Sequence, residues 1–393
     1  MVATRSSQKR SGAAPLKTSS AKRHKYIFVI GGVMSGVGKG IATSSIGLIL
    51  QSKGFKVNAV KIDPYLNVDA GTMNPTEHGE VFVLRSGLET DQDMGNYERF
   101  LNVSLKKEDY MTSGMVYQHV LEKERNLGYK GRCVEAIPHV RDEIIRRIQL
   151  ATAENGSDIS VIEIGGTVGD FQNALFIDAA RVLKLEHPED VIFVLVSYLP
   201  IPGSLGEMKT RPTQNAVHQL SSYGVQTNFI IARASQPLDQ RRKEKISISS
   251  NVPVDNIISA PDVESIYDVP LNFEHEHIGD MLMKTLGLPK RKGHGLKEWE
   301  KFVGKVKGAR KSVNIAIVGK YFDTGDFVLS DAYLSVIEAI KYSSAEVGVK
   351  SHITWINAKD FQKDPKSVSM LDEYDGVIVP GGFGETGIEG KIL

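Results

Sequence analysis

The sequence predicts an α/β protein: a doubly wound, mostly parallel sheet in a P-loop-like domain, followed by the start of a second α/β domain. Two observations carry this prediction. Short apolar, β-branched segments alternate with helical segments, the pattern of parallel strands joined by crossover helices. Several of these segments end in glycine or polar residues, among them Gly31, Asp63, Gly165 and Ser197. Since ligands of doubly wound sheets bind outside the carboxyl ends of the strands, we expect the functional site at that edge.

The elements of the first domain follow in chain order. The apolar stretch 26–31 predicts a buried strand, and a helix is expected to begin near Ile41. Residues 63–95 are rich in turn formers and are expected to form a loop with closely spaced carboxylates. Helical periodicity is present at 114–126 and 138–153. Further strands are expected at 56–62, 158–164, 191–196, 228–232 and 256–259.

A change in composition follows residue 287. The stretch 288–311 contains Pro, Gly and a cluster of bases and predicts a linker. Beyond it we expect a helix at 330–346 and strands at 313–318, 350–356 and 375–380. The part 312–393 is shorter than most α/β domains, so we expect it to be the first part of a larger, truncated or split domain.

The bulk composition is that of a globular protein. The 393 residues exceed one ordinary domain, and 41% hydrophobic with 24% charged residues suits a sizeable core. The sequence contains neither a signal-peptide core nor an apolar run of about eighteen residues, which argues against a membrane protein. One cysteine, Cys133, excludes an intramolecular disulfide and a thiolate metal site. We therefore expect a cytoplasmic protein in which this thiol is packed.

The net charge of +1 is unevenly distributed along the chain. Residues 1–25 hold seven Lys or Arg and no Asp or Glu, which leaves 41 bases against 47 acids and a net charge of −6 for the rest. We expect a disordered basic tail at 1–25. The acidic balance of the remainder gives no electrostatic reason to expect nucleic-acid binding.

The stretch 26–45, YIFVIGGVMSGVGKGIATSS, combines a strand, a glycine-rich turn and the start of a helix. Glycines let backbone N–H groups approach an anion, and a helix N-terminus favours negative charge. Lys39 adds an ammonium for the terminal phosphates of a nucleotide. The usual G-x-x-x-x-G-K-[ST] pattern is not met, because Gly32 falls one residue early and Gly40 replaces the hydroxyl residue that binds Mg²⁺. A tight turn without phosphate binding therefore stays open.

Four carboxylates at or near expected strand ends can supply the missing metal ligands: Asp63, Asp91, Asp93 and Glu163. Glu163 lies inside the apolar run VIEIGG, where an unpaired buried carboxylate is costly. Mg²⁺ binds one or two carboxylates together with phosphate oxygens, so Asp93 and Glu163 form a consistent set with Mg²⁺ and ATP. An ion pair for Glu163 and a surface charge for Asp91 are the alternatives.

A second anion site is expected at 209–214, KTRPTQ. Pro212 suits the first turn of a helix, and two cations with two hydroxyls at that N-terminus can bind a triphosphate. A helix cap with solvated bases is the alternative, and spacing alone makes Lys245 one of several surface bases. Two phosphate sites beside Mg²⁺ carboxylates suggest that ATP activates a second phosphorylated substrate.

Taken together, these stretches resemble the CTP synthase family, the ligases that make CTP from UTP, ATP and ammonia drawn from glutamine. The resemblance extends over about 25–393. It is identified on the motifs KYIFVIGGVMSGVGKGI, KIDPYLNVDAGTMNPTEHGEVFV, ETDQDMGNYERF, VIEIGGTVGD, GEMKTRPTQ and VPGGFGETGIEG.

The resemblance implies a role for each motif. It makes 26–287 the ATP- and UTP-binding synthetase, or amidoligase, domain and 312–393 the first part of a glutamine amidotransferase domain. Lys39 and Lys61 are implied to be catalytic, and Asp93 and Glu163 to bind Mg²⁺. The implied ATP contacts are Gly36, Val37, Gly38, Lys39, Gly40, Ile41, Asp93, Asp262 and Val263. The implied contacts of UTP, and of CTP as feedback inhibitor, are Ser35, Asp170, Phe171, Gln172, Lys209, Thr210, Arg211, Pro212, Thr213, Gln214 and Lys245.

The resemblance also implies the chemistry and the assembly. The uracil O4 is phosphorylated, and ammonia then displaces phosphate at C4, with catalysis mainly by positioning and charge neutralisation. A homotetramer with nucleotide sites at subunit interfaces, filaments, and GTP as an allosteric activator are implied as well. No nucleic-acid or membrane partner is expected.

Two features depart from the family pattern. Asp170-Phe171-Gln172 stands where the family has Asp-x-Glu, which leaves the strength of CTP feedback open. Gly382 matches a glutamine-contacting glycine, but the family's nucleophilic Cys and its His/Glu pair belong to a part that this sequence does not contain, and Cys133 lies in the wrong domain to replace them. We expect the chain to use free ammonia, and to use glutamine only with that part or a partner polypeptide.

Two other functions stay open at this point. One is another P-loop-like ATPase or amidoligase, related to dethiobiotin or cobyrinate synthetases, which ATP turnover without UTP would favour. The other is a non-catalytic assembly or filament subunit, which assembly without turnover would favour.

Overall fold

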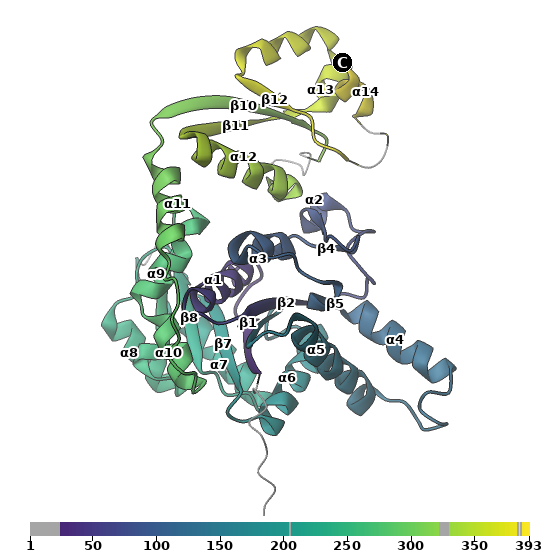
Figure 1. Cartoon of the computed structure of the whole chain (residues 1–393), viewed down its shortest axis with the longest axis vertical. Helices are drawn as coiled ribbons and strands as arrows, with labels where there is room; N and C mark the ends of the chain where they lie inside the picture. Colours follow the sequence, from purple (N-terminus) through teal and green to yellow (C-terminus); the bar gives the residue numbers. More distant parts are fainter. Residues whose placement is uncertain (1–23, 204–205, 322–329, 383–384, 386) are drawn as a thin grey trace, which may run out of the picture.

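A seven-stranded parallel sheet forms the centre of the first domain (Figure 1). The structure, a computed structural model, describes residues 24–203, 206–321, 330–382, 385 and 387–393. The strand order is β5-β2-β6-β1-β7-β8-β9, and all pairs along it are parallel. The strands are β1 (Lys25–Gly31), β2 (Val57–Asp63), β5 (Tyr110–Thr112), β6 (Ile159–Ile164), β7 (Val191–Tyr198), β8 (Phe229–Ala234) and β9 (Ile257–Pro261).

Helices cover both faces of this sheet, which gives three layers. One face carries α4 (Ser113–Arg125), α5 (Arg141–Asn155), α6 (Ala174–Glu186), α7 (Arg211–Ser222) and α8 (Gln240–Ser250). The other face carries α1 (Lys39–Ser52), α9 (Val269–His275) and α10 (Ile278–Thr285), with α3 (Asp93–Leu101) packed beside α1. The predicted α/β class and doubly wound sheet are confirmed.

Strand β1 shows why the sheet strands are almost continuously apolar. Tyr26, Phe28 and Ile30 belong to the core beneath the α4–α8 layer, whereas Ile27 and Val29 belong to the core beneath α1. Successive side chains of a strand point to opposite faces, so a strand covered on both sides buries every position.

The strand order reverses at β1. The chain leaves β1 for β2, β5 and β6 on one side and then crosses to β7, β8 and β9 on the other. Such a switch point opens a crevice at the carboxyl ends of its strands, here the ends of β1 and β7. The glycine-rich turn follows β1, and the loop to α7 follows β7, so both expected anion sites border this crevice.

The expectation of a loop over 63–95 is wrong. This region contains α2 (Pro75–His78), the antiparallel hairpin of β3 (Val81–Val83) and β4 (Glu89–Asp91), and the start of α3. Strands of three residues are too short to show an alternating pattern, and a four-residue helix is too short to show helical periodicity.

The stretch 288–311, expected to be a linker, contains helix α11 (Lys297–Gly308). Trp299, Phe302, Val303 and Val306 lie on one side of this helix at helical spacing and pack in an aromatic cluster. Because several Lys and Gly residues surround them, the overall composition of the stretch does not indicate this apolar face of the helix.

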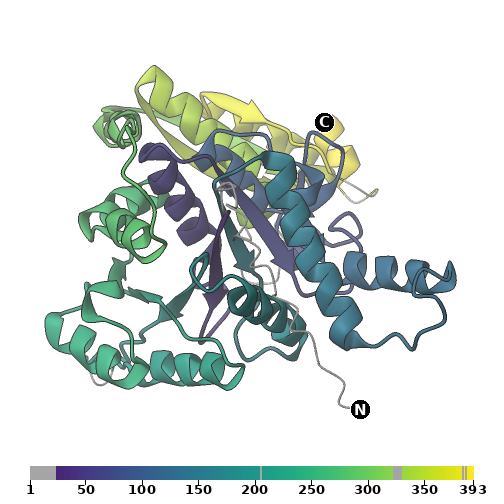
Figure 2. The same ribbon diagram turned by 60° about the horizontal axis from the view of Figure 1, so that its bottom comes forward.

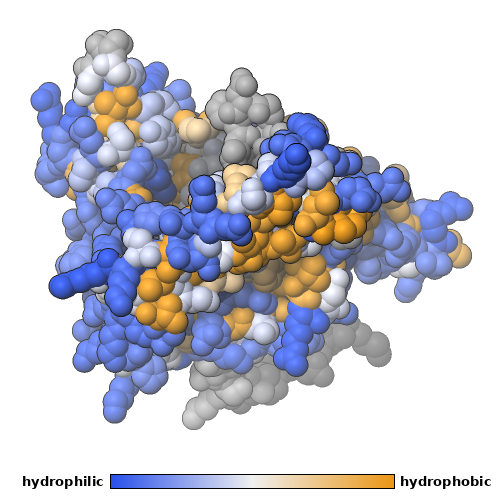
Figure 3. Space-filling model, turned by 90° about the horizontal axis from the view of Figure 1, so that it is seen from above, coloured by the Kyte–Doolittle hydropathy of each residue, from blue (hydrophilic) through white to orange (hydrophobic). Residues whose placement is uncertain are grey.

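The second domain has a three-stranded parallel sheet of order β11-β10-β12. Helix α12 (Leu334–Val347) lies between this sheet and the first domain (Figure 1). Seen from above, exposed apolar side chains gather over the second domain (Figure 3), and Val347, Val377 and Val379 are among its exposed apolar residues. The other elements are β10 (Lys311–Gly319), β11 (Val349–Asn357), β12 (Gly376–Ile378), α13 (Ala358–Lys363) and α14 (Ile388–Ile392).

Three sequence expectations concern the periphery. The basic tail 1–25 lies outside the described residues except for its last two, of which Lys25 begins β1 and pairs with Asp190 at 2.7 Å. Cys133 is exposed rather than packed, in the segment after α4, which projects from the body (Figure 2). Within the described ranges, none of the helices has the length and apolar character needed to cross a bilayer.

Candidate active site

The glycine-rich turn after β1 forms an open cradle at the N-terminus of α1. Gly36 and Gly38 have positive φ angles of 69° and 90°, a conformation that favours glycine. Gly38 caps α1 without any side-chain hydrogen bond, so the first N–H groups of the helix are left for an anion. Ser35 is exposed beside this turn, and Val37 is buried.

Lys39 ties this turn to the neighbouring strand. Its side chain is buried, and its Nζ donates to the carbonyl oxygen of Gly166, just beyond β6, at 2.8 Å. A side chain on Gly31 would meet both groups, since its Cβ would lie 2.9 Å from the Gly166 oxygen and 3.0 Å from Lys39 Nζ. The ammonium is therefore held at the carboxyl ends of β1 and β6.

The Lys61 ammonium lies at the centre of the four predicted carboxylates. Its Nζ is 2.6 Å from Asp93, 3.0 Å from Glu163, 3.6 Å from Asp63 and 3.9 Å from Asp91. Lys61 and Glu163 are opposite one another on the paired strands β2 and β6, which explains how one cation reaches this set. We refer to these five residues as the carboxylate cluster.

Burial and mutual charge shift the pKa values within the carboxylate cluster. Burial disfavours the Lys61 ammonium, but the surrounding carboxylates outweigh it and raise its pKa well above the ordinary value. Burial raises the pKa values of Glu163 and Asp91. The pKa of Asp93 is lowered, because the charge of Lys61 and its hydrogen bond outweigh burial.

The structure bears on two alternatives from the sequence. Glu163 forms the ion pair with Lys61 and also accepts a hydrogen bond from the Tyr97 hydroxyl, so it is neither unpaired nor free. Asp91 is not an isolated surface charge, because it belongs to the cluster and accepts the Asp93 N–H at 2.8 Å.

Carboxylate oxygens lie directly beside the cradle. Asp93 begins α3 directly against Gly40, where a Cβ would lie only 2.1 Å from Asp93 Oδ1. Oxygen ligands next to a phosphate cradle are the surroundings that Mg²⁺ prefers. Within the described parts of the chain, no group of three or more His, Cys, Asp or Glu is placed to hold a metal ion; here the Lys61 ammonium stands among the carboxylates.

The second anion stretch lies at the N-terminus of α7. Thr213 Oγ1 and Ser197 Oγ, at the end of β7, are buried and 2.8 Å apart, which fixes the first turn of α7 to the sheet. Lys209 pairs with Glu207 at 2.6 Å. The pKa of Glu207 is lowered by this hydrogen bond and further by the charges of Lys245 and Arg242, so bases of α8 gather at the same place.

The glycine-rich turn packs against the second turn of α7. A Cβ on Gly32 would lie 2.7 Å from the Cβ of Ala216 and 3.7 Å from Ser197 Oγ. Only glycine allows this approach. The structure therefore brings the two predicted anion-binding stretches to the same edge of the sheet.

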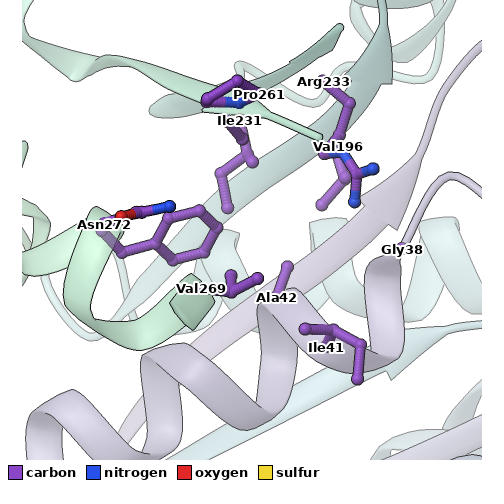
Figure 4. A pocket seen from close by; sticks show the side chains of 11 residues that line it. Gly38, Ile41, Ala42, Val196, Ile231, Arg233, Pro261, Val269 and Asn272 are labelled. Carbon is purple, nitrogen blue, oxygen red and sulfur yellow. The ribbon is translucent and has the colours of Figure 1, made fainter. Parts of the chain in front are cut away.

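A pocket opens beside the cradle, on the α1 side of the sheet (Figure 4). Arg233, at the end of β8, points toward Gly38 and pairs with the predicted Asp262 at 2.6 Å. Its Nε is buried without a hydrogen-bond partner. The remaining lining is mostly apolar: Ile41, Ala42, Val196, Ile231, Ala260, Pro261, Val269, Asn272 and Phe273.

Sequence reasoning missed Arg233. A signal was present, because an arginine near the carboxyl end of the apolar strand FIIARA is placed at the ligand edge of a parallel sheet. Val263, which the resemblance placed at the same nucleotide, follows Asp262 and is partly exposed.

The turn after β6 carries the Asp170-Phe171-Gln172 sequence. The Thr167 N–H donates to Asp170 Oδ2 at 2.6 Å, and the Asn173 amide donates to the carbonyls of Gly165 and Thr167. This rigid turn leaves Phe171 91% exposed. Asp170 is thus engaged with its own backbone, whereas Phe171 and Gln172 face outward.

Gly382 lies in the second domain, after β12. A Cβ at this position would lie 2.7 Å from Lys320 Cε and 3.2 Å from the Tyr321 ring. The backbone therefore passes close to these side chains of the second domain.

Comparison with known proteins matches both domains. Residues 25–288 match the family model of the CTP synthase N-terminus, and residues 328–393 match the glutamine amidotransferase class-I model. The chain is 51% identical over 370 residues to a CTP synthase of Pyrococcus abyssi, which covers 94% of this chain and 67% of that protein. It is 49% identical to a CTP synthase of Thermococcus gammatolerans and 46% identical to one of Saccharolobus solfataricus, each covering 94% of this chain and 68% or 69% of the relative. The resemblance seen in the motifs is confirmed, and the chain belongs to the CTP synthase family.

Proposed function

We propose that this chain is a CTP synthase-type ligase that aminates UTP to CTP with ATP as co-substrate, at the carboxyl edge of the first domain's sheet. One observation carries the proposal: the glycine-rich turn after β1 packs at Gly32 against Ala216 in the second turn of α7, the helix whose N-terminus is the second anion site. ATP and UTP held at these two anion sites would therefore share one crevice, in which the γ-phosphate of ATP can reach the base of UTP. This arrangement is what transfer of a phosphoryl group from one nucleotide to the base of another requires.

ATP binds in the cradle and in the pocket beside it. The N–H groups of 36–41 and the Lys39 ammonium hold the phosphates, and the apolar pocket by Arg233 takes the adenine. Arg233 and Asp262 then provide polar contacts at the edge of the ring, with Val263 next to them. The buried, unpartnered Nε of Arg233 supports a ligand at this place.

UTP binds from the α7 side. The residues at 209–214 and Lys245 supply cations and helix N–H groups for its triphosphate. Ser35 and the turn with Asp170, Phe171 and Gln172 border the same crevice. CTP shares the triphosphate and ribose of UTP, so we propose that it inhibits by binding here.

Asp93 and Glu163 are proposed to hold Mg²⁺, which when bound neutralises charge on the transferring phosphoryl group. Lys61 aligns both carboxylates through its hydrogen bonds to each. Lys39, at the end of β1, is placed to contact the same phosphoryl group.

The reaction balances in two steps. The uracil O4 attacks the γ-phosphorus of ATP as the ring nitrogen N3 loses its proton to solvent, and the bond between that phosphorus and the β–γ bridging oxygen breaks, which releases ADP. Ammonia then attacks C4, the C4–O4 bond breaks, and phosphate leaves. The incoming nitrogen loses one proton and becomes the 4-amino group of CTP. The chain's own contribution is to orient both nucleotides and to place cations around the phosphoryl group.

Other parts of the proposal go beyond this site. Gly382 is proposed to contact glutamine as the ammonia source, and GTP to act as an activator. A homotetramer that forms filaments is proposed as the assembly. A cytoplasmic location is proposed because a lone cysteine, Cys133, suits a reducing compartment.

The test is CTP formation by the purified chain from UTP, ATP, Mg²⁺ and ammonium chloride. Lys39→Ala should lower the rate about 10²–10³-fold, by analogy with removal of one preorganised charge donor. Lys301→Ala, an exposed lysine of α11 paired with Glu298, is the matched control and should leave the rate unchanged. A folded chain that forms no CTP, or that hydrolyses ATP equally without UTP, contradicts the proposal.

A further inference from the structure

Helix α12 of the second domain contacts the first domain through residues at helical spacing. Ser335, Glu338 and Tyr342 lie on one face of the helix. Each contacts a different part of the first domain or of α11. These contacts lead to the carboxylate cluster by two routes.

The first route runs through Glu80. The Ser335 N–H and Oγ both donate to Glu80 Oε2, at 2.9 and 2.7 Å. Glu80 directly precedes β3, and in the β3–β4 hairpin Val81 stands opposite Asp91. One residue therefore separates the α12 contact from the backbone of a member of the cluster.

The second route runs through an aromatic cluster formed by Phe100, Tyr267, Trp299, Phe302 and Tyr342. The Tyr267 hydroxyl donates to Glu338, whose carboxylate is 1% exposed and is also held by Lys341 at 2.8 Å. The Tyr267 and Trp299 rings contact Phe100, with centroids 6.3 and 4.9 Å away, and Tyr342 stacks on Phe302 at 4.7 Å.

Helix α3 connects the aromatic cluster to the carboxylate cluster. Phe100 lies near its end, Tyr97 one turn earlier donates to Glu163, and Asp93 begins the helix. The two routes meet where β3 packs on α3, since a Cβ on Gly95 would lie 2.8 Å from the Phe82 ring. Phe100, Tyr97 and Tyr267 are all at most 2% exposed, so a shift of α12 cannot be absorbed by loose packing.

We propose that Glu80 and the Tyr267–Glu338 pair are positioning residues, through which α12 of the second domain sets the placement of Asp91, Asp93 and Glu163 and hence the metal affinity of the first domain. The inference rests on the metal role proposed above. It gives the second domain an influence on the synthetase site that does not depend on delivering ammonia.

The experiment measures binding of Mn²⁺ alone to the full chain, from the electron paramagnetic resonance signal of the free ion. Glu80→Ala and Tyr267→Phe should each weaken Mn²⁺ binding about 3- to 10-fold, a usual size for coupling between sites. Glu80→Gln keeps an acceptor for Ser335 and should bind Mn²⁺ nearly as the unaltered chain does. Glu346→Ala is the control, because Glu346 lies on the same helix but pairs with Lys305 of α11.

A second measurement separates positioning from general damage. In the ammonium assay, the Mg²⁺ concentration for half-maximal rate should rise in Glu80→Ala, while the rate at saturating Mg²⁺ stays within about twofold. Should Glu80→Ala fail to fold, Tyr267→Phe decides, because it removes one oxygen atom only. Variants that bind Mn²⁺ as Glu346→Ala does overturn the coupling even if the chain makes CTP. Weakened Mn²⁺ binding in a chain that makes no CTP supports the coupling and contradicts the proposed function.

Discussion

The ammonium of Lys61 on β2 lies 3.0 Å from the carboxylate of Glu163, directly opposite it on β6, and 2.6 Å from Asp93 at the start of α3. One buried cation thus offsets a group of carboxylates that could not stay ionised together without it. The same carboxylates are those proposed to bind Mg²⁺. With the proposed Mg²⁺ bound, two cations, the Lys61 ammonium and the exchangeable metal ion, would share one set of oxygens.

Replacing Lys61 tests this sharing. Lys61→Met should lower the free energy of unfolding by about 3–5 kcal/mol, because it leaves buried carboxylates without their cation. Addition of Mg²⁺ should then raise the melting temperature more in this variant than in the unaltered chain, since the ion replaces the lost charge. Thermal unfolding with and without Mg²⁺ measures both effects.

The control for this prediction is Lys53→Met. Lys53 also pairs with two carboxylates, Glu274 and Asp280, but Asp280 is exposed. Its loss should cost about 1 kcal/mol or less and should not create a response to Mg²⁺. An equal Mg²⁺ response in both variants would refute a metal role for the carboxylate cluster.

Arg233 is the residue that most directly tests the adenine pocket. Arg233→Ala should raise KM for ATP by about tenfold or more and leave KM for UTP within about twofold, because one charged hydrogen-bond donor is worth about 1.5–3 kcal/mol. Initial rates at varied ATP and varied UTP measure the two constants. Arg181→Ala removes a similar Arg–Asp pair on α6 and should change neither. A rise in KM for UTP alone would indicate that Arg233 contacts UTP and not ATP.

The sequence singles out residues of the candidate site where an unusual residue occurs in a regular element, and the structure brings these residues to one edge of the sheet. Glu163 was found because an acid interrupts an apolar strand, and Lys39 because it stands in a glycine-rich turn. A role for Lys61 follows only from the family resemblance. The stretch KIDP does not show which carboxylates surround this lysine, because its partner Glu163 comes beside it only when β2 pairs with β6. Such pairings depend on how the strands align in the fold, and the residue pattern of a single strand does not contain that information.

The errors have a similar origin. Arg233 was missed because its importance comes from Gly38 and Asp262, which are far from it in sequence. The composition of 288–311 predicts a linker although helix α11 lies there. Trp299 and Phe302 stabilise this helix by packing in the aromatic cluster, and these tertiary contacts are not visible in the composition. Periodicity predicts long elements well, and it fails where a short element is stabilised by its tertiary contacts.

Gln172 tests the departure from the family pattern. Gln172→Glu restores the carboxylate that the family carries at this place and should lower the CTP concentration for half-inhibition about 3- to 10-fold, since an ionised acceptor strengthens hydrogen bonds to ribose hydroxyls. Inhibition curves at fixed UTP measure it. Gln226→Glu introduces the same charge change on the surface loop before β8 and is the control. Unchanged inhibition in Gln172→Glu would show that this turn does not contact CTP.

Asp109 gives a prediction on pH that is independent of the active site. This carboxylate is fully buried and accepts hydrogen bonds from the Asn58 and Asn155 amides and from the Lys106 N–H. Burial raises its pKa to about 6 from 3.8, against the opposing effect of these hydrogen bonds. Between these two values the native state binds the proton more tightly than the unfolded state, so stability falls as pH rises through this window.

This contribution should be about 2–3 kcal/mol between pH 4 and pH 6. Asp109→Asn cannot ionise, so the difference in unfolding free energy between the unaltered chain and this variant should change by that amount across the window. The variant should also be less stable at every pH, because one amide oxygen cannot accept all three hydrogen bonds. Urea unfolding at several pH values measures both. A pH-independent difference for Asp109→Asn would mean that Asp109 ionises in the native state near its ordinary pKa.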